Sequence, residues 1–409
     1  MRILFFCQYF TPEVGAPAAR THEHARRWVA RGHQVTVLCG LPNHPDGIVP
    51  PTYRGKWLYR EEIDGIRVLR CWFLVAPNRG VFKRCVSFLS FMASAVGFGI
   101  FATGKCDVVV GTTPQMLCAL GGYLVSRIKR RPFVLEVRDL WPKHIIDLGA
   151  ITNPIIIHGL QRLEMFLYRR SRAVITVSEA SRQYIEARGI SPQKLFTITN
   201  GIDETFFVPK EKNGIRAARG WSDKFVVLYI GTHGLSQGLG TILDTAELLA
   251  GESRFHFVFV GGGAEWEGLS KEAIHRGLGN SEFLPSQPKA AMPDFYAAAD
   301  CCLVPLKNKD VFRYNIPSKM FEIMACARPI ILGAEGQARQ LLEEAHAGIA
   351  VEPENAAAYR DAIQRLAAEP ALCEQFGANG RAHVLANYTR NRKADEFLDC
   401  LEGTLRHEP

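Results

Sequence analysis

The stretch KFVVLYIGTHGLSQGLGTILDTAELL, residues 224–249, contains a short apolar run, a glycine-rich segment and a segment with helical periodicity, in that order. The apolar run indicates a buried strand, and the spacing of apolar residues after Gly240 indicates an amphipathic helix. Glycines between a strand and a helix let a phosphate group approach backbone N–H groups. The segment matches neither the P-loop nor the dinucleotide fingerprint, so alone it fits a structural turn as well as a phosphate site.

The same alternation of strand and helix runs along the whole chain of 409 residues, which is too long for one ordinary core. It is typical of parallel sheets covered by helices. We therefore expect an α/β fold with two facing Rossmann-like domains and a central cleft, where ligands bind at the carboxyl ends of the strands. The expected parts are a first domain over 1–200, a linker over 201–215, a second domain over 216–387 and a C-terminal helix over 388–409 that crosses back to the first domain.

Individual elements follow from the same periodicities. In the first half, the apolar runs predict strands over 2–10, 34–40, 66–73, 106–113, 132–139, 173–178 and 194–201. Helical periodicity predicts helices over 18–31, 85–104, 116–129 and 155–170. In the second half, strands are predicted over 224–234, 255–263, 281–285, 301–306 and 328–333, with helices between them.

The positive charge is concentrated in the first half of the chain. Residues 1–200 hold 27 Lys and Arg against 13 Asp and Glu, a net +14, whereas the whole chain has a net +8. An anionic partner is therefore expected for this half, either a phospholipid surface or a phosphorylated acceptor. Nucleic acid is not expected, because no nucleic-acid-binding signature is present. The 11 cysteines lie mostly in apolar runs without a CxxC pair, which favours buried thiols in a reducing cytoplasm.

The segment CVSFLSFMASAVGFGIFATG, residues 85–104, has 20 uncharged residues and could by length span a bilayer. It is rich in Ser, Gly and Ala, and a strand of the same domain is expected directly after it. Three interpretations stay open: a membrane span, a helix of the core, and a helix on the membrane surface. The last is favoured by the neighbouring Arg79, Lys83 and Arg84, which suit anionic headgroups.

The segment IPSKMFE, residues 316–322, begins a predicted helix. Pro317 suits the first helical turn and Ser318 can hydrogen-bond there. Lys319 would add a positive charge to the free N–H groups of that turn, where a diphosphate is favoured, and the carboxylate of Glu322 could accept ribose hydroxyls. The alternative is an ion pair between Lys319 and Glu322 on a solvent-facing turn.

Two further segments end predicted strands of the first domain. VLEVRDLWP, residues 134–142, places Arg138 and Asp139 where catalytic side chains project, although an Arg–Asp pair at a strand end is the alternative. Gly15, in the loop after the first strand, could let a ligand come close to the backbone. No D-x-D motif is present, and we expect neither a metal ion nor another cofactor.

Taken together, these segments resemble the retaining, nucleotide-sugar-dependent glycosyltransferases of family 4, which have the GT-B fold. The resemblance covers nearly the whole chain. Within this family, the sequence is most similar to the bacterial surface-polysaccharide branch of WcaI-like and WbuB-like transferases. The motifs that carry it are, in family order, PEVGAPAAR, VARGHQVTVLCG, RDLWP, NGID, AAADCCLVPL and PSKMFEIMA.

The resemblance implies catalytic roles for Asp139, Lys319 and Glu322, with Glu322 matching the second glutamate of the E-x7-E motif. Two positions depart from the family: Tyr314 replaces the first glutamate, and Thr232 and Gln237 replace basic residues of the phosphate site. Lys319 is therefore expected to carry more of the diphosphate charge. The other donor-binding residues implied are Gly15, Arg138, Gly231, Thr232, His233, Gly234, Gln237, Gly238, Leu284, Ser286, Tyr314, Asn315, Ile316, Pro317 and Ser318.

The implied reaction is same-face substitution, in which the leaving nucleotide diphosphate helps to deprotonate the incoming hydroxyl. The expected donor is a UDP-sugar carrying an N-acetylhexosamine such as N-acetyl-L-fucosamine or N-acetylglucosamine. The expected acceptor is a polyprenyl-diphosphate-linked saccharide of surface polysaccharide, at the inner face of the bacterial cytoplasmic membrane. A nucleotide-sugar 2-epimerase and a catalytically silent subunit of a polysaccharide assembly complex are the alternatives, and Tyr314 favours the silent subunit.

Overall fold

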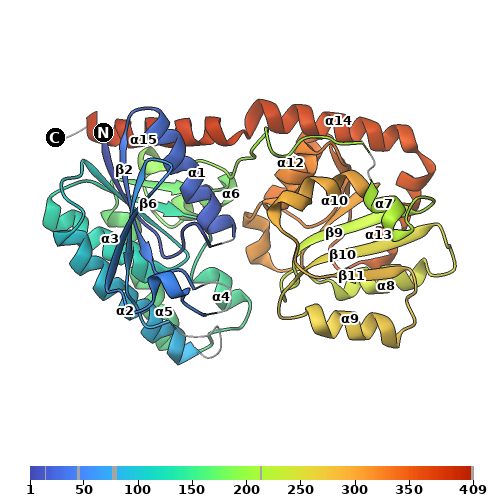
Figure 1. Cartoon of the computed structure of the whole chain (residues 1–409), viewed down its shortest axis with the longest axis horizontal. Coiled ribbons are helices and arrows are strands. Elements are labelled where there is room, and N and C mark those ends of the chain that lie inside the picture. The colour runs from blue at the N-terminus through green and yellow to red at the C-terminus, as the bar shows by residue number, and fades with distance from the viewer. Residues whose placement is uncertain (14, 44–46, 76–80, 212–213, 407–409) are drawn as a thin grey trace. The chain divides into compact units, whose positions relative to one another are not determined.

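The computed structural model describes residues 1–13, 15–43, 47–75, 81–211 and 214–406. The chain forms two compact units, Met1–Asn200 together with Arg390–Pro409, and Gly201–Thr389. Each unit is a largely parallel sheet covered by helices (Figure 1). The α/β class with two Rossmann-like units is thereby confirmed. Of the expectations above, Val14, Arg79, residues 212–213 and residues 407–409 lie outside the described residues.

The first unit contains an eight-stranded sheet in the order β3-β4-β2-β1-β5-β6-β7-β8. Its paired strands are parallel except β3, which pairs antiparallel with β4. The edge strand β3 was not predicted, because LYREEI has three charged residues in succession and forms no apolar run. The strands are β1 Arg2–Phe6, β2 Gln34–Gly40, β3 Leu58–Ile63, β4 Ile66–Cys71, β5 Val108–Thr112, β6 Phe133–Val137, β7 Ala173–Thr176 and β8 Leu195–Thr197.

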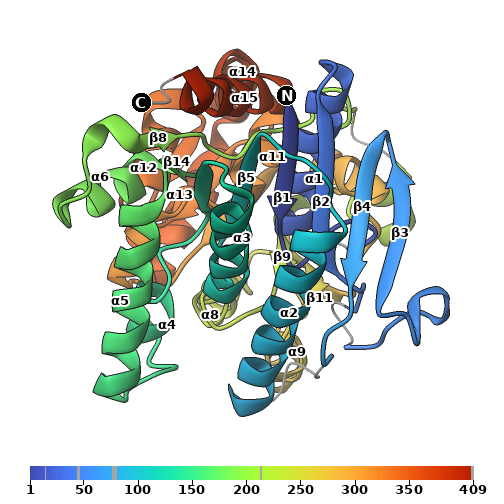
Figure 2. The same cartoon turned by 90° about the vertical axis from the view of Figure 1, so that its left-hand side faces the viewer.

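Helices cover both faces of this sheet. On one face α3 packs against both α2 and α5 (Figure 2). On the other, α15 packs on α1, where Trp28 Nε1 donates to the Ala394 carbonyl at 2.8 Å and Arg27 pairs with Asp395 at 2.7 Å. The helices are α1 Ala16–Ala30, α2 Val81–Phe101, α3 Met116–Lys129, α4 Lys143–Asp147, α5 Pro154–Arg170, α6 Glu179–Ala187 and α15 Arg390–Arg406.

The uncharged segment 85–104 forms most of α2, which begins at Val81 and ends at Phe101. Phe91 and Ala95 of this helix are fully buried against the rest of the unit, whereas Leu89 and Phe101 are exposed. None of the helices in the described parts of the chain is long and apolar enough to cross a membrane. The helix therefore buries one side in its own unit and exposes apolar residues on another.

The second unit contains a six-stranded parallel sheet in the order β11-β10-β9-β12-β13-β14. Its strands are β9 Phe225–Thr232, β10 Phe255–Gly262, β11 Ser281–Leu284, β12 Cys301–Pro305, β13 Ile330–Gly333 and β14 Gly348–Ala350. Its helices are α7 Gly214–Arg219, α8 Gly240–Leu248, α9 Trp266–His275, α10 Met292–Ala298, α11 Lys319–Ala325, α12 Gln337–Ala345, α13 Ala356–Ala368 and α14 Pro370–Asn387.

Successive residues of β9 enter two different hydrophobic cores, as the alternation of side chains along a strand requires. Val226 and Leu228 pack on the side that holds α10, α11 and α12. Val227 and Tyr229 pack on the side that holds α8 and α13. The sheet is thus covered on both faces, and its carboxyl edge is the edge that remains for a ligand.

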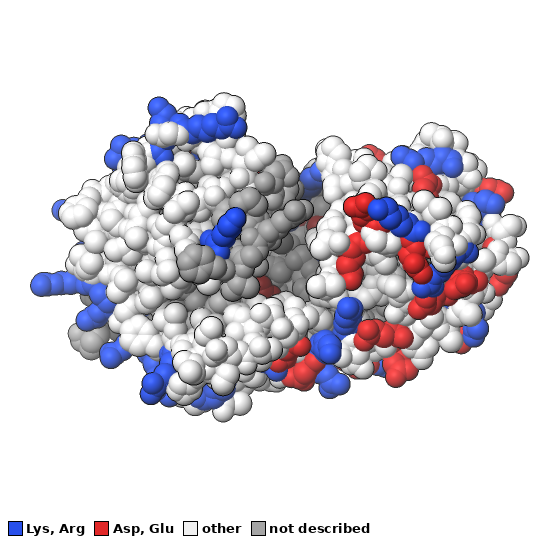
Figure 3. Space-filling model, turned by 90° about the horizontal axis from the view of Figure 1, so that it is seen from below, with Lys and Arg blue, Asp and Glu red and all other residues white. Residues whose placement is uncertain are grey.

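The surface charge reflects the excess of Lys and Arg in the first half of the sequence. On the face shown in Figure 3, Lys and Arg side chains are spread over the first unit, drawn on the left. The second unit, on the right, shows Asp and Glu side chains gathered among Lys and Arg. The basic character of residues 1–200 is therefore a property of the surface of the first unit.

Candidate functional site

The order of strands in the second unit defines where a ligand of this kind of sheet binds. The chain proceeds from β9 outward to β10 and β11, then returns to place β12 on the other side of β9. The connections that follow β9 and β12 therefore leave the sheet in opposite directions, which creates a crevice at the carboxyl ends of these two strands. The glycine-rich segment follows β9, and the segment that leads to α11 follows β12.

The glycine-rich segment 231–238 is held in place by one internal hydrogen bond and by hydrogen bonds with two neighbouring segments. The His233 N–H donates to the Gly262 carbonyl at 2.9 Å. The Gly234 N–H donates to Gln237 Oε1 at 3.2 Å. The Lys307 N–H, in the loop after β12, donates to the Ser236 carbonyl at 2.9 Å. The segment is thus a braced turn whose shape exists before any ligand arrives.

Lys319, the first residue of α11, reaches this segment with its ammonium. Its Nζ lies 3.9 Å from the centroid of the Tyr229 ring. A Cβ atom on Gly231, which has φ +143°, would lie only 2.8 Å from the same Nζ. The ammonium therefore lies close to both the Tyr229 ring and the backbone of Gly231, at the carboxyl end of β9.

The charge of Lys319 is weakly compensated. Burial lowers the pKa of this lysine to about 7, although the nearby Glu322 carboxylate acts in the opposite direction. Within the described part of the chain, no carboxylate lies within ion-pair distance of the ammonium. The ion pair with Glu322 that the spacing allowed is therefore not formed, and an anion that reached Lys319 would raise its pKa.

Glu322 lies one turn further along α11, and a tyrosine hydroxyl fixes its carboxylate. The Tyr296 hydroxyl donates to Glu322 Oε2 at 2.9 Å, and Tyr296 itself is fully buried in α10. Burial, with the neighbouring Glu322 charge, raises the pKa of Tyr296 well above its ordinary value, so the hydroxyl stays protonated and remains a donor. A carboxylate held in this way is oriented for further hydrogen bonds from hydroxyl groups.

His233 is buried in the middle of the glycine-rich segment, with its ring edge-to-face against Tyr229. Its Nδ1 lies 3.1 Å from the Gly231 carbonyl oxygen, and that oxygen requires a proton on Nδ1. Burial lowers the pKa of His233 to about 4, so the ring is neutral at physiological pH. His233 therefore braces the turn and contributes no positive charge to it.

The remaining predicted residues of the second unit surround this turn or lead to α11. Leu284 ends β11, and Ser286 Oγ lies 3.0 Å from the position that a Cβ of Gly262 would take. Tyr314 ends a short 3-10 helix, Asp310–Tyr314, and Asn315, Ile316, Pro317 and Ser318 connect this helix to Lys319. Together with Thr232, Gln237 and Gly238 of the glycine-rich turn, these residues lie at the carboxyl ends of β9, β11 and β12 or in the segments that follow them.

The predicted residues of the first unit follow β1 and β6, at the carboxyl edge of its own sheet. Gly15 immediately precedes α1, and the backbone N–H of Arg138 donates to Thr113 Oγ1 at 3.1 Å. The loop after β1 is also at a reversal of strand order, because β5 lies on the opposite side of β1 from β2. Arg138 and Asp139 thus follow β6 at the edge of the first sheet where ligands bind.

A buried ion pair supports the end of β6. Arg20 Nε donates to Glu136 Oε1 at 2.8 Å, and Thr112 Oγ1 donates to Glu136 Oε2 at 2.7 Å. Burial opposes ionisation of Glu136, but the positive charges of Arg20 and Arg138 prevail and its pKa is lowered. Burial also lowers the pKa of Arg138. Arg138 is thus held in a crowded cationic environment beside Asp139.

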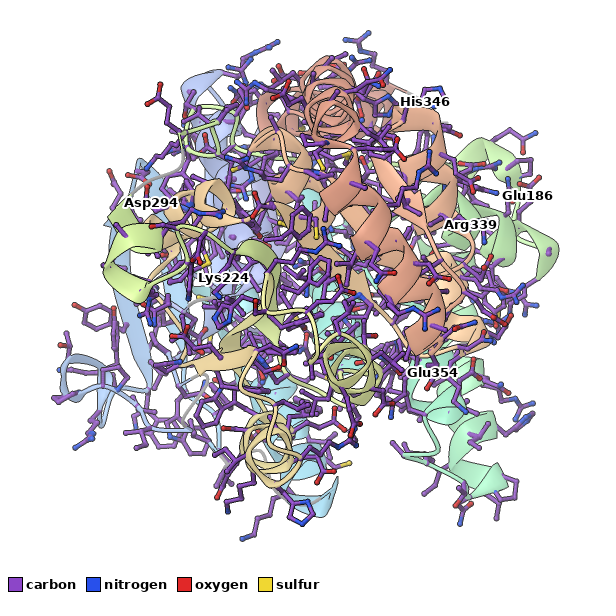
Figure 4. All side chains as sticks on the ribbon, turned by 90° about the vertical axis from the view of Figure 1, so that its right-hand side faces the viewer. Glu186, Lys224, Asp294, Arg339, His346 and Glu354 are labelled. Carbon is purple, nitrogen blue, oxygen red and sulfur yellow. The ribbon has the colours of Figure 1, made fainter. Side chains whose placement is uncertain are left out.

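Several residues around the site of the second unit were not predicted from the sequence. Tyr229 and Tyr296 lie in apolar segments that indicated only core. Glu354, labelled in Figure 4, lies in the loop before α13 and its Oε2 accepts from the Asn308 N–H at 2.8 Å, which holds the loop after β12. The hydroxyl group of each tyrosine could have indicated a role beyond packing, because a buried hydroxyl requires a hydrogen-bond partner.

Among the described residues, no group of three or more His, Cys, Asp or Glu is arranged to hold a metal ion. A groove of about 1020 Å³ lies in the first unit between β8 and α15, and none of the predicted site residues lines it. Lys319 is one positively charged residue next to the glycine-rich turn, and Lys307 is another.

Two family models match consecutive parts of the chain. Residues 15–201 match the model described as glycosyl transferase 4-like domain. Residues 211–383 match the model described as glycosyl transferases group 1. The two matches follow the two units, and together they include every site residue named above.

Proteins that are similar to this chain over most of its length are also named as glycosyltransferases. WcaI of Escherichia coli (strain K12), a glycosyl transferase named for colanic acid biosynthesis, is 28% identical over 98% of this chain and 100% of its own length. WbjE of Pseudomonas aeruginosa, which is named as a glycosyltransferase, is 26% identical over 73% of this chain and 75% of its own length.

Two solved structures have the same fold. Sucrose-phosphate synthase from Thermosynechococcus elongatus superposes with a TM-score of 0.80 at 18% identity, over 100% of both chains. Anabaena HepE, solved with UDP and glucose, superposes with a TM-score of 0.75 at 19% identity, over 98% of this chain and 99% of its own. At these identities the likeness establishes the two-domain GT-B fold.

Proposed function

The chain belongs to the group 1 glycosyltransferases, and we propose that it moves an N-acetylhexosamine from a UDP-sugar to a polyprenyl-diphosphate-linked saccharide. The configuration at the sugar carbon is retained. The product belongs to a bacterial surface polysaccharide, such as an O-antigen, a capsule or an exopolysaccharide. The names of WcaI and the UDP complex of HepE support the pathway and the donor, respectively.

One observation carries this proposal: the weakly compensated ammonium of Lys319 lies beside Gly231 at the carboxyl end of β9. A diphosphate is the natural partner for a cation beside a glycine turn, where no Cβ blocks its approach. Its negative charge would raise the pKa of Lys319 and keep the ammonium protonated. As the bond to the sugar breaks, charge develops on the departing diphosphate, and Lys319 is placed to stabilise it.

The other residues of the site have distinct roles in this mechanism. Glu322, held by Tyr296, accepts the ribose hydroxyls of the donor. Leu284 and Ser286 line the base, and Tyr314 with the backbone of Asn315 and Ile316 lies near the sugar. Asp139, beside Arg138 in the first unit, orients the sugar or the acceptor, and the departing diphosphate accepts the proton of the incoming hydroxyl.

We further propose that the first unit binds the anionic inner face of the cytoplasmic membrane, where a lipid-linked acceptor resides. Its net charge of +14 over residues 1–200 supports this. Ile155 and Ile156, at the start of α5, are 81% and 51% exposed, and no residue of 154–162 is buried. Exposed aliphatic side chains on a basic unit are the combination that a lipid surface binds.

The transfer reaction is tested with purified protein, UDP-N-acetylhexosamines and a synthetic polyprenyl-diphosphate-linked saccharide, with products identified by mass spectrometry. The proposal predicts sugar on the lipid acceptor, and loss of transfer in Lys319→Ala. Lys271→Ala is the matched control, because Lys271 is a surface lysine of the same unit, paired with Glu267. Sugar interconversion without acceptor would favour an epimerase, and no turnover of any UDP-sugar would contradict the proposal.

Membrane binding is tested by co-sedimentation with vesicles of phosphatidylglycerol and phosphatidylethanolamine. Ile155→Asp/Ile156→Asp should reduce the bound fraction several-fold, because it replaces apolar side chains with charges that anionic lipid repels. Ile274→Asp is the matched control, since Ile274 is 78% exposed on α9 of the second unit. Absence of wild-type binding to these vesicles would contradict the membrane part of the proposal.

A further inference from the structure

Among the described residues, Tyr229 is the one aromatic residue whose ring contacts the Lys319 ammonium. The Nζ lies 3.9 Å from the ring centroid. An aromatic face attracts a cation through its quadrupole and carries no net charge. A carboxylate in the same place would attract the ammonium more strongly, but it would also repel an approaching diphosphate. Tyr229 therefore offers a position for the cation that leaves its charge available.

The ring is itself fixed in place. Tyr229 is fully buried in β9, and its hydroxyl donates to the Thr232 carbonyl at 2.6 Å. The imidazole of His233 packs edge-to-face against it, with 5.3 Å between the ring centroids. One side chain thus makes contact with both parts of the site, the glycine-rich turn through its hydroxyl and the lysine through its ring.

The backbone of Gly231 also lies close to the ammonium. A Cβ on Gly231 would lie 2.8 Å from Lys319 Nζ and 3.6 Å from the Tyr229 hydroxyl oxygen. The ammonium thus contacts a buried, hydrogen-bonded ring and lies close to a glycine that has no side chain. Because the ammonium already has a fixed position, the lysine loses less rotamer freedom when it binds an anion.

We propose that Tyr229 is a positioning residue, which holds the Lys319 ammonium at the glycine-rich turn and so sets the preference of the site for a nucleoside diphosphate over the nucleoside alone. This inference rests on the proposed function, because it assumes that Lys319 binds the diphosphate of the donor. The ring is the part of Tyr229 that acts on the lysine, and the hydroxyl is the part that acts on the turn.

The two parts are separated by substitution. Tyr229→Phe keeps the ring and removes the hydroxyl, whereas Tyr229→Leu and Tyr229→Met remove the ring and keep an apolar side chain. Affinities for UDP and for uridine are measured by calorimetry on each variant, because uridine has no phosphate for Lys319 to bind. A loss that is only structural weakens both ligands, whereas a loss of lysine positioning weakens UDP alone.

The expected result is a fall of about tenfold in the UDP-to-uridine affinity ratio for Tyr229→Leu, from the usual range of cation–π energies. Tyr229→Met should give the same fall, and Tyr229→Phe should keep the ratio with a lowered melting temperature. In a Lys319→Ala background, Tyr229→Leu should change the ratio no further. Tyr359→Leu, at another fully buried tyrosine of the same core, is the matched control and should keep the ratio.

A wild-type ratio in both Tyr229→Leu and Tyr229→Met, with UDP still bound, would overturn the positioning role and leave the proposed function intact. A wild-type protein that binds neither UDP nor another nucleoside diphosphate would overturn both. An equal fall in the ratio for Tyr229→Phe would also overturn the assignment, because it would place the effect in the hydroxyl.

Discussion

Replacement of Lys319 by methionine should make the free protein more stable while it removes nucleotide binding. Burial lowers the pKa of Lys319 from 10.5 to about 7, and one pKa unit corresponds to about 1.4 kcal/mol. The whole shift would therefore cost the folded state about 5 kcal/mol when the lysine is charged. Because the side chain keeps partial contact with water, screening reduces this cost to about 2 kcal/mol. Methionine fills a similar volume without a charge.

The dependence on pH follows from the direction of the shift. Below pH 7 the lysine is charged in both the folded and the unfolded state, so the folded state bears the full cost of the buried charge. Between pH 7 and 10.5 the folded state has released the proton while the unfolded state retains it, so the cost decreases as the pH rises. The stability advantage of Lys319→Met should therefore be greatest near pH 6 and smallest near pH 10.

The assay is thermal unfolding of wild type and Lys319→Met at pH 6, 8 and 10, with Lys271→Met as the control for loss of a surface lysine. For a unit of this size, about 2 kcal/mol corresponds to a rise of roughly 4–8 °C in melting temperature at pH 6. The difference should shrink to near zero by pH 10. A Lys319→Met protein that melts below wild type at pH 6, or a difference that does not change with pH, would show that the buried charge of Lys319 does not destabilise the fold.

Three further changes test other parts of the account. Gly231→Ala adds a Cβ 2.8 Å from the Lys319 ammonium, at a residue whose φ is +143°. UDP affinity measured by calorimetry should therefore fall at least about tenfold. Unchanged affinity would count against this location of the diphosphate. Tyr296→Phe removes the donor to Glu322 and should weaken uridine binding severalfold with a stability loss of about 1 kcal/mol, whereas unaltered uridine affinity would argue against ribose recognition there. Glu136→Gln leaves Arg20 buried without its carboxylate and should destabilise the first unit by about 3 kcal/mol in urea unfolding; a change below about 0.5 kcal/mol would contradict the importance of this pair.

Much of the architecture could be predicted because hydrophobic periodicity is a local property. The strand over 34–40 and the helix over 116–129 have the bounds that the sequence predicted. The edge strand β3 was missed because LYREEI contains three successive charged residues, which resemble a loop. The helix α6, Glu179–Ala187, was also missed, although Ser178 accepts from the Ser181 N–H at its start as an N-cap does.

Less of the site than of the fold could be predicted from the sequence. The proximity of Lys319 and Glu322 follows from helical spacing, but their partners lie in other elements: Tyr229 in β9 and Tyr296 in α10. Both tyrosines lie in segments of apolar residues, where periodicity indicates core and nothing more. Only the pairing of β9 with β12 brings the lysine to the glycine-rich turn, and the register of parallel strands is not encoded in either strand alone.

The most direct test is a crystal structure of the protein with UDP. If Lys319 binds the donor diphosphate, oxygens of UDP should lie within about 3 Å of its Nζ, the usual length of a charge-assisted hydrogen bond. The Gly231–Gly238 turn should lie beside them, and the ribose hydroxyls should donate to Glu322. The Tyr229 ring should remain beneath the ammonium. A diphosphate held elsewhere in the chain, with Lys319 still on the ring and without an anion, would contradict the central claim.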